Sequence, residues 1–152
     1  MARVVVGVDG SPAARGALAW AAEESRLRGA TLEVVYAYGG ASAWVGMADT
    51  VGAVVTENFA EDTVDQAARS TLEGLVAEGL GTDPPPEVVL SAVPLKAAEA
   101  LIEASRGADL VVVGSRGHGD VGSVLLGSVG LHCAHHAHCP VVIVRPQTAE
   151  PG

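Results

Sequence analysis

The sequence is poor in lysine and in basic residues generally. Lys96 is its only lysine among nine basic residues, against 18 acidic ones, and the formal net charge is -9. A protein that binds nucleic acid or an anionic membrane surface needs a basic face, so this balance argues against both partners. An anionic ligand must therefore be held by backbone amides, a metal ion or a few arginines.

Long hydrophobic runs and a cysteine framework are also missing. No apolar run approaches the about 18–20 residues that a membrane-spanning helix needs. The two cysteines, Cys133 and Cys139, do not indicate the disulfide scaffold of a small secreted protein. Residues 1–6 run directly into a strand-like segment without the separate apolar core of a signal peptide. We therefore expect a cytoplasmic protein without a membrane partner.

Aromatic residues are few, whereas small aliphatic residues are abundant. One Phe, two Trp and two Tyr occur in 152 residues, of which 49% are hydrophobic. This composition suits valine-rich strands covered by alanine-faced helices. The length fits one domain, which we expect over residues 1–146, followed by a disordered tail over 147–152.

Short valine-rich runs alternate with longer helical patterns along the chain, which is typical of βαβ units and a parallel sheet. Five strands are too few for a closed barrel of eight, so we expect an open, doubly wound α/β sheet. Such sheets bind ligands at the carboxyl ends of their strands, where the strand order reverses. The strands are expected at residues 3–9, 31–38, 87–92, 109–114 and 140–145, and the helices at 12–28, 57–80, 94–106 and 128–136.

Local signals mark the ends and the buried faces of these helices. Ser11 is suited to cap a helix that begins with Pro12, and Gly29 is suited to end it. Pro94 is expected to open the third helix. Helical spacing predicts two buried stripes. Their members are Ala14, Leu18, Ala21 and Ser25 in the first helix, and Val64, Ala68, Leu72, Leu75 and Val76 in the second.

The most informative segment is residues 114–128, which contains five glycines between a buried strand and a helix. Glycines let backbone N–H groups approach an anion without interference from Cβ. The start of the helix adds unpaired amides and the positive end of its dipole. The hydroxyl of Ser128 is placed to donate to a phosphate oxygen. The segment therefore predicts a phosphate-binding loop.

Two common phosphate motifs do not fit this chain. The Walker loop requires a lysine, and residues 114–128 contain none. The dinucleotide fingerprint belongs in the first βα turn, where residues 7–12 have the wrong glycine spacing. The spacing that fits is Gly-x2-Gly-x9-Gly-Ser, filled by Gly114, Gly117, Gly127 and Ser128.

This spacing resembles the ATP-binding signature of the universal stress proteins. Residues 4–11 are similar to the first strand and turn of that family, and residues 139–145 are similar to its last strand. The resemblance spans the whole chain as a single-domain member. It implies a Rossmann-like fold of the adenine nucleotide alpha hydrolase type, with five parallel strands in the order 3-2-1-4-5 and helices on both faces.

The resemblance also implies a site and an assembly. Gly7 and Asp9 would belong to the nucleotide site, and Asp9 would contact the nucleoside of ATP or its Mg²⁺. The end of the second strand, with Ala37 as its best single position, would line the adenine pocket through its backbone. The last strand, Val141 to Val144, would pair with its copy in a homodimer. The phosphates would be held by loop residues and the start of the following helix: Gly114, Ser115, Arg116, Gly117, Gly119, Gly127, Ser128 and Val129.

Several residues keep two interpretations. Asp9 either contacts the ligand or caps the turn that follows it. Arg116 either neutralises phosphate or pairs with an acidic neighbour, and Asp120 is either a Mg²⁺ ligand or a structural turn residue. The segment 132–139, with four histidines and two cysteines, either binds a transition metal or is structural, which its spacing favours. Trp44 and Met47 either close over the nucleotide or pack locally.

Three functions are compatible with such a site. The first is a regulatory ATP-binding protein in a stress response, because no clear pair of base and nucleophile is present. The second is an enzyme that hydrolyses ATP slowly. The third is a sensor of AMP, ADP or cyclic AMP. The hydroxyl of Ser128 and the length of the loop favour a triphosphate.

Overall fold

The computed structural model describes residues 2–39, 61–81, 84–115 and 126–145, and these ranges contain five strands and four helices. Strands and helices alternate strictly in the described ranges. In chain order the elements are β1 (Arg3–Gly7), α1 (Pro12–Arg28), β2 (Thr31–Ala37), α3 (Glu61–Leu80), β3 (Val88–Val93), α4 (Ala97–Ala104), β4 (Leu110–Gly114), α5 (Ser128–His136) and β5 (Val141–Val144).

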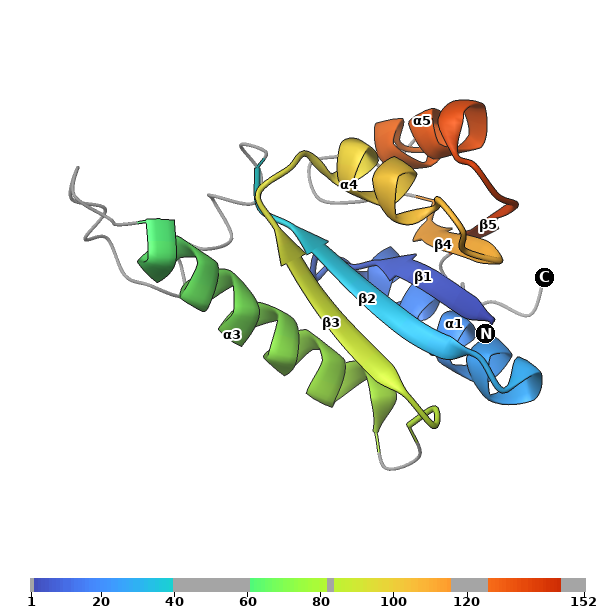
Figure 1. Ribbon diagram of the computed structural model, residues 1–152, viewed down its shortest axis with the longest axis horizontal. Helices are drawn as coiled ribbons and strands as arrows, with labels where there is room; N and C mark the ends of the chain where they lie inside the picture. Colours follow the sequence, from blue (N-terminus) through green and yellow to red (C-terminus); the bar gives the residue numbers. More distant parts are fainter. Residues whose placement is uncertain (1, 40–60, 82–83, 116–125, 146–152) are drawn as a thin grey trace.

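The five strands form one parallel sheet in the order β3-β2-β1-β4-β5 (Figure 1). The central strand β1 pairs with β2 on one side and with β4 on the other, so that Val5 is in register with both Glu33 and Val111. The chain moves outward in one direction through β2 and β3, and in the other through β4 and β5. The predicted fold class is confirmed, and the strand order reverses between β1 and β4.

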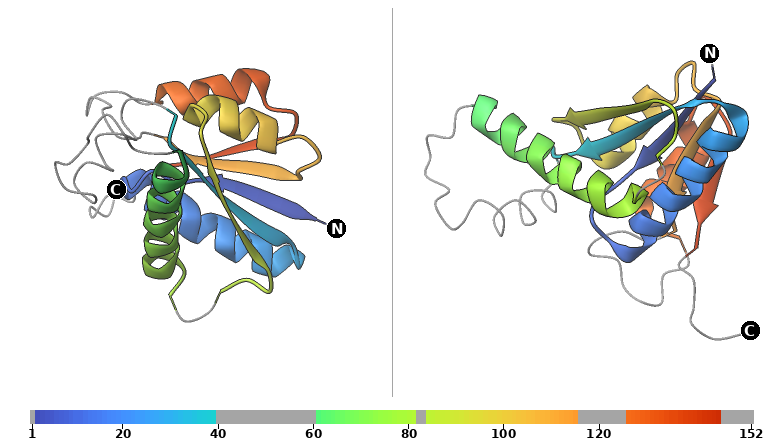
Figure 2. Two further views of the ribbon diagram at one scale, coloured as in Figure 1. Left: turned by 60° about the vertical axis from the view of Figure 1, so that its left-hand side comes forward. Right: turned by 90° about the horizontal axis from the view of Figure 1, so that it is seen from below.

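Helices cover both faces of the sheet, with α1 and α3 on one face and α4 and α5 on the other (Figure 2). Each layer of helices closes its own hydrophobic core. The first core includes Val6, Leu18 and Leu72, and the second includes Leu101 and Cys133. Alternate residues of β1 point into the two cores, which explains why its three central valines are all fully buried.

The predicted ends of α1 and the predicted buried faces of α1 and α3 are confirmed where they are described. Ser11 Oγ accepts a hydrogen bond from the N–H of Ala14 at 3.2 Å, and Gly29 ends α1 with φ of 61°. The predicted stripe of α1 is buried, and in α3 Ala68 and Leu72 are buried. Alanine and leucine at helical spacing therefore supply the layer that packs on the valines of the sheet.

The prediction that Pro94 opens the third helix is wrong. After β3 the chain continues beside β2, because the N–H of Tyr38 donates to Val93 O and the N–H of Gly39 donates to Leu95 O, both at 2.9 Å. The first helical carbonyl is that of Lys96, which accepts from Ala100 at 2.9 Å. Pairing across the sheet thus delays the start of α4 to Ala97.

Other boundaries shift by one or two residues, and some predictions fall on residues that are not described. Strand β1 ends at Gly7 rather than at residue 9, although the N–H of Val8 still donates to Val35 O at 3.0 Å. Residues 40–60, which include Trp44 and Met47, and the tail 146–152 lie outside the described ranges. No helix in the described ranges is long and apolar enough to span a membrane.

Candidate functional site at the carboxyl edge of the sheet

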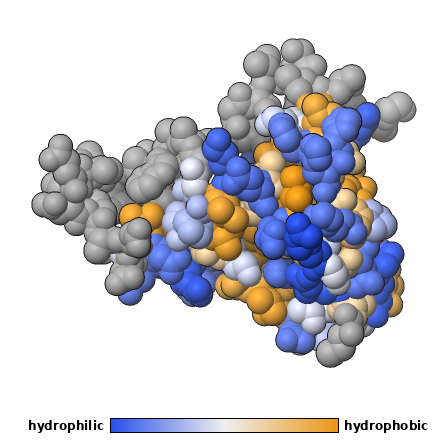
Figure 3. Space-filling model, turned by 45° about the horizontal axis from the view of Figure 1, so that its top comes forward, coloured by the Kyte–Doolittle hydropathy of each residue, from blue (hydrophilic) through white to orange (hydrophobic). Residues whose placement is uncertain are grey.

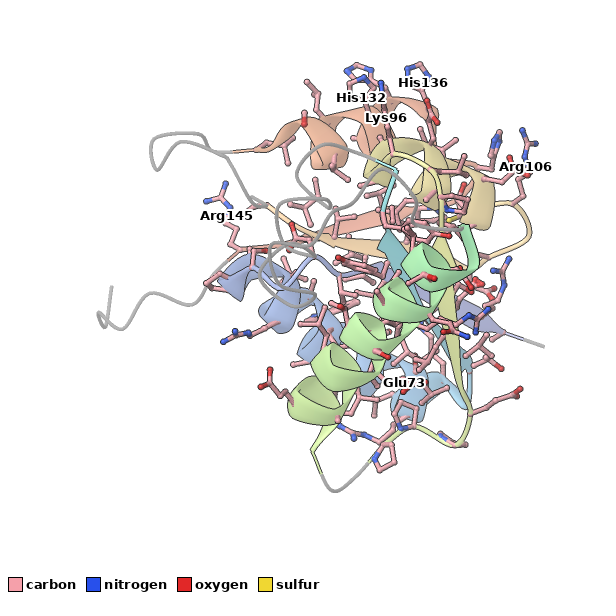
Figure 4. All side chains as sticks on the ribbon, turned by 90° about the vertical axis from the view of Figure 1, so that its left-hand side faces the viewer. Glu73, Lys96, Arg106, His132, His136 and Arg145 are labelled. Atoms are coloured by element: carbon pink, nitrogen blue, oxygen red, sulfur yellow. The ribbon has the colours of Figure 1, made fainter. Side chains whose placement is uncertain are left out.

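Segments that are far apart in the sequence meet at the carboxyl ends of the strands. Asp9 follows β1, Ala37 ends β2, Ser115 follows β4, and Ser128 begins α5. Because all five strands are parallel, their carboxyl ends share one edge of the sheet. Figure 4 shows the molecule from the side toward which the strand arrowheads of Figure 1 point. Most of the described site residues predicted from the sequence come from this edge.

Asp9 organises the turn between β1 and α1. Its Oδ1 accepts a hydrogen bond from the N–H of Ser11 at 2.8 Å, and Gly10 between them has φ of 84°, which favours glycine. Burial raises the pKa of the Tyr36 phenol, and the negative charge of Asp9 raises it further. Asp9 therefore caps the turn, as the structural interpretation predicted. Its charge also affects the phenol of Tyr36 near the end of β2.

The glycine-rich loop is closed at its base by backbone hydrogen bonds. The N–H of Ser115 donates to Val144 O of β5 at 2.9 Å, and the N–H of Gly127 donates to Ser115 O at 2.6 Å. These bonds join the end of β4 to the start of α5. The amides of Ser115 and Gly127 are thus used within the protein and hold the two ends of the loop together.

The start of α5 differs from the start of α1. The residue before α5 is Gly127, which has no side chain to cap the helix, whereas Ser11 caps α1. The first three amides of a helix have no acceptor within it, and in α5 these belong to Ser128, Val129 and Gly130. Ser128 is also exposed. This end of α5 therefore presents donors and the positive end of a helix dipole at the site.

A model of the universal stress protein family matches residues 1–145. The chain belongs to the universal stress protein family. Universal stress protein Rv2623 of Mycobacterium tuberculosis is 34% identical over 146 residues, which are 95% of this chain but 48% of that relative. A universal stress protein of Thermus aquaticus is 33% identical over 144 residues, covering 93% of this chain and 97% of the relative. The chain thus spans about half of the first relative's length and nearly all of the second's.

Solved structures of universal stress proteins share the fold. A universal stress protein in complex with cAMP has a TM-score of 0.61 and 24% sequence identity, covering 96% of this chain and 98% of that one. At this identity the likeness concerns the fold, and it agrees with the observed strand order.

Two of the glycines at the site of this universal stress protein have packing reasons of their own. A Cβ at Gly114 would lie 2.8 Å from the carbonyl carbon of Ala13, in the first turn of α1. A Cβ at Gly7 would lie 2.8 Å from the Cδ1 atom of Leu101 in α4. Gly114 therefore lets the backbone of α1 approach the end of β4, and Gly7 leaves room for a side chain of α4.

Some predicted residues of the site are outside the described ranges, and one described residue was missed. Arg116, Gly117, Gly119 and Asp120 belong to the part of the loop that is not described. Asp65 of α3 was not predicted; its Oδ1 accepts a hydrogen bond from the hydroxyl of Tyr38 at 2.9 Å. This bond ties α3 to the end of β2. No sequence pattern distinguishes Asp65 from the other acidic residues of α3.

The histidines and cysteines of residues 132–139 do not form a metal cluster. Within the described ranges, no group of three or more His, Cys, Asp or Glu could hold a metal ion. His132 Nδ1 lies 2.9 Å from Ser128 O, within its own helix. Cys133 is buried, and burial and then the charge of Cys139 raise the pKa of its thiol to about 11. Burial is also the main reason why the pKa of Cys139 is raised.

Proposed function

We propose that this chain is a regulatory protein that binds ATP at the carboxyl edge of its sheet, in the cytoplasm and in a response to stress. The observation that carries the proposal is the start of α5, where Gly127 provides no side-chain cap, near the edge at which the parallel strands end. A protein with a net charge of -9 and one lysine has few other ways to hold a triphosphate.

The phosphates would lie over the start of α5. The amides of Ser128, Val129 and Gly130 and the hydroxyl of Ser128 supply the donors, and the loop residues Arg116, Gly117 and Gly119 are proposed to close over the phosphates. Gly114, Ser115 and Gly127 contribute by holding the ends of the loop together, since the amides of Ser115 and Gly127 are already engaged. In this proposal the start of α5 contacts the phosphates, whereas the base of the loop fixes the position of the loop's two ends.

The adenine and ribose would lie toward β1 and β2. Ala37 offers backbone groups at the end of β2, where it pairs with Val93 of β3. Gly7 and Asp9 form the neighbouring wall at the end of β1. The carboxylate of Asp9 suits the ribose or a Mg²⁺ that arrives with the triphosphate, because oxygen donors are the ligands that Mg²⁺ prefers. One of its oxygens is oriented by the N–H of Ser11.

A second candidate ligand is cyclic AMP. The universal stress protein of the same fold that was solved in complex with cAMP favours this alternative. A cyclic monophosphate would use the amides of α5 but would leave the far part of the loop without phosphate to hold. AMP and ADP lie between the two cases.

Isothermal titration of the purified protein with Mg-ATP, ADP, AMP and cyclic AMP tests the proposal. We expect ATP to bind most tightly and removal of Mg²⁺ to weaken it. Tighter binding of cyclic AMP than of ATP would transfer the proposal to the second candidate. No binding of any adenine nucleotide would refute the nucleotide site altogether.

We propose that the protein is not an enzyme, although slow hydrolysis remains the competing activity. A phosphate-release assay with excess Mg-ATP separates the two. We expect no sustained release beyond one phosphate per site. Continued turnover that tracks with the purified protein would favour the enzyme.

We also propose that the protein is a homodimer through β5. This strand ends the sheet, so one of its sides has no strand partner among the described residues. Pairing with a second copy would cover the edge and prevent uncontrolled association.

A further inference from the structure

The few basic residues of this acidic protein are distributed unequally between two kinds of environment. Of the nine, five form ion pairs with acidic side chains. Four of these pairs lie within a single helix or just past its end, and the fifth joins β1 to β2. The pairs are Arg3–Glu33, Arg26–Glu23, Arg28–Glu24, Arg69–Asp65 and Arg106–Glu103.

The remaining basic residues follow the carboxyl ends of the strands. Arg15 lies in the first turns of α1, Lys96 lies between β3 and α4, and Arg145 follows β5. All three are exposed, and none forms an ion pair with another described residue. Arg116, which follows β4, lies outside the described ranges. The positive charge that is not paired within the described protein therefore lies at the edge that carries the proposed site.

Arg145 extends from the junction at the base of the loop. The residue before it, Val144, accepts the N–H of Ser115 at 2.9 Å, and Ser115 in turn accepts the N–H of Gly127 at 2.6 Å. Arg145 is thus one residue from the bonds that close the loop. Figure 4 shows its guanidinium standing out from the sheet between α5 and α1, whereas Lys96 lies farther up in this view.

Arg15 approaches the same junction from α1. It is separated by one residue from Ala13, whose backbone is in close contact with Gly114, and its neighbour Gly16 faces β5. A Cβ at Gly16 would lie 3.8 Å from the Cγ1 atom of Val144. The backbones at Arg15 and Arg145 therefore flank one point, where α1, β4 and β5 meet.

We infer that Arg145, together with Arg15, binds the additional phosphates of a longer nucleotide and makes the site prefer a polyphosphate to a monophosphate. The inference rests on the proposed nucleotide site. Helix amides can bind the first phosphate of ATP and of AMP alike, so a strong preference between them needs groups that meet the added phosphates. A guanidinium beside the loop base pairs with the added negative charge of the longer chain, and arginine suits phosphate oxygens because it can offer two parallel N–H donors.

The test compares Arg145→Gln and Arg15→Gln with the unchanged protein, by titration with Mg-ATP and with AMP at two salt concentrations. Glutamine keeps a polar side chain but removes the charge. We expect Arg145→Gln to weaken ATP roughly tenfold, the size of one lost hydrogen bond between charged groups, and AMP less than about twofold. The ATP affinity should also become less sensitive to salt, and Arg15→Gln should act in the same direction but less strongly.

Arg106→Gln is the matched control. Arg106 is an exposed arginine that follows the C-terminal end of α4, away from the carboxyl edge of the sheet, and it pairs with Glu103. We expect it to leave both affinities unchanged. Sedimentation of each variant shows whether its oligomeric state is preserved. If the unchanged protein binds both nucleotides and Arg145→Gln leaves the ratio of the ATP and AMP affinities as it was, or weakens both equally, the inference is wrong while the nucleotide site stands. If the unchanged protein binds neither, the proposed function fails and the inference fails with it.

Discussion

At the scale of single residues, the glycines of the site have different structural roles. Gly114 is required by the close approach of Ala13, and Gly10 by its positive φ. Gly127 has φ of -73° and ψ of 168°, which any residue can adopt. Its importance lies in the missing side chain at the helix start. The same residue type thus serves packing, turn formation and an open helix end at one edge of the sheet.

The packing role of Gly114 is tested by Gly114→Ala. The added Cβ would lie within 3 Å of the Ala13 backbone, which cannot turn away as a side chain could. We expect a loss of about 1–3 kcal/mol in the free energy of unfolding, measured by urea denaturation. Gly74→Ala in α3 is the control, because its Cβ meets nothing within 4 Å; it should be neutral or stabilising by up to about 1 kcal/mol. Equal stabilities of the two variants would contradict the packing role.

Cys133 predicts a stability loss at alkaline pH. Its pKa is about 11 in the folded protein against an ordinary 9.0, so the unfolded chain releases the thiol proton first. The contribution is complete below pH 9 and declines by up to about 3 kcal/mol as the pH rises through 11. Urea denaturation in reducing buffer at pH 8, 9, 10 and 11 measures it. The pH slope should flatten most in Cys133→Ala and only partly in Cys139→Ala, because Cys139 has a raised pKa of its own and contributes to that of Cys133. An unchanged slope in Cys133→Ala would refute the assignment.

At the scale of elements, α1 and α5 show two ways to begin a helix at the same edge of the sheet. Ser11 satisfies an amide of α1 with its own hydroxyl, so that end is closed. Gly127 leaves the amides of α5 without a side-chain cap. A capping residue would typically stabilise α5 by about 1 kcal/mol. Without one, this helix end is open to an acceptor supplied by a ligand.

Gly127→Asp tests this difference. An aspartate at this position would cap α5 and put a negative charge where the phosphate is proposed to bind. We expect the protein to become as stable as before or more so, while ATP binding is lost, as measured by thermal unfolding and titration calorimetry. Gly74→Asp changes the net charge equally at a distant helix and should keep binding. ATP binding that survived in Gly127→Asp would mean that the phosphates do not use the start of α5.

At the scale of the whole molecule, the two edges of the sheet differ in what surrounds them. The β5 edge adjoins Arg145 and the base of the loop, whereas the β3 edge lies beside α3. Hydrophobic residues on the face that carries α4 and α5 appear as separate patches among hydrophilic ones (Figure 3). Leu95, just before α4, and Leu131, in α5, have exposed fractions of 39% and 47%. The backbone edge of β5 is therefore the better candidate for assembly than this face.

Ile143→Pro tests dimerisation through β5. Pro140 O and Val144 O accept from β4, so the even-numbered residues of β5 face β4 and the N–H of Ile143 faces outward. Proline removes that outward donor and should convert the dimer to a monomer in analytical ultracentrifugation. Leu90→Pro makes the same change at the outward side of β3, because Glu87 O and Val93 O face β2, and should leave a dimer. A dimer that persisted in folded Ile143→Pro would place the interface elsewhere.

The sequence by itself determined the alternation of strands and helices, both ends of α1, the buried stripes and the spacing of the glycine loop. These features depend on neighbours within a few residues, which the periodicity and the capping residues report directly. The family resemblance supplied the strand order, which the structure confirms. The shared edge that brings Asp9, Ala37 and Ser128 together follows from that order.

Only the tertiary structure decided which polar groups at this edge are already engaged. Contacts between separate elements decide three features of the site. The amides of Ser115 and Gly127 are occupied, α4 begins only at Ala97, and Arg145 lies beside the loop base. The local sequence pattern does not indicate which groups pair across distant segments. A hydrogen bond or an ion pair forms only between groups that the folded chain brings within about 3 Å of each other. The same sequence of donors and charges becomes a site only when the fold has used some and left others at one edge.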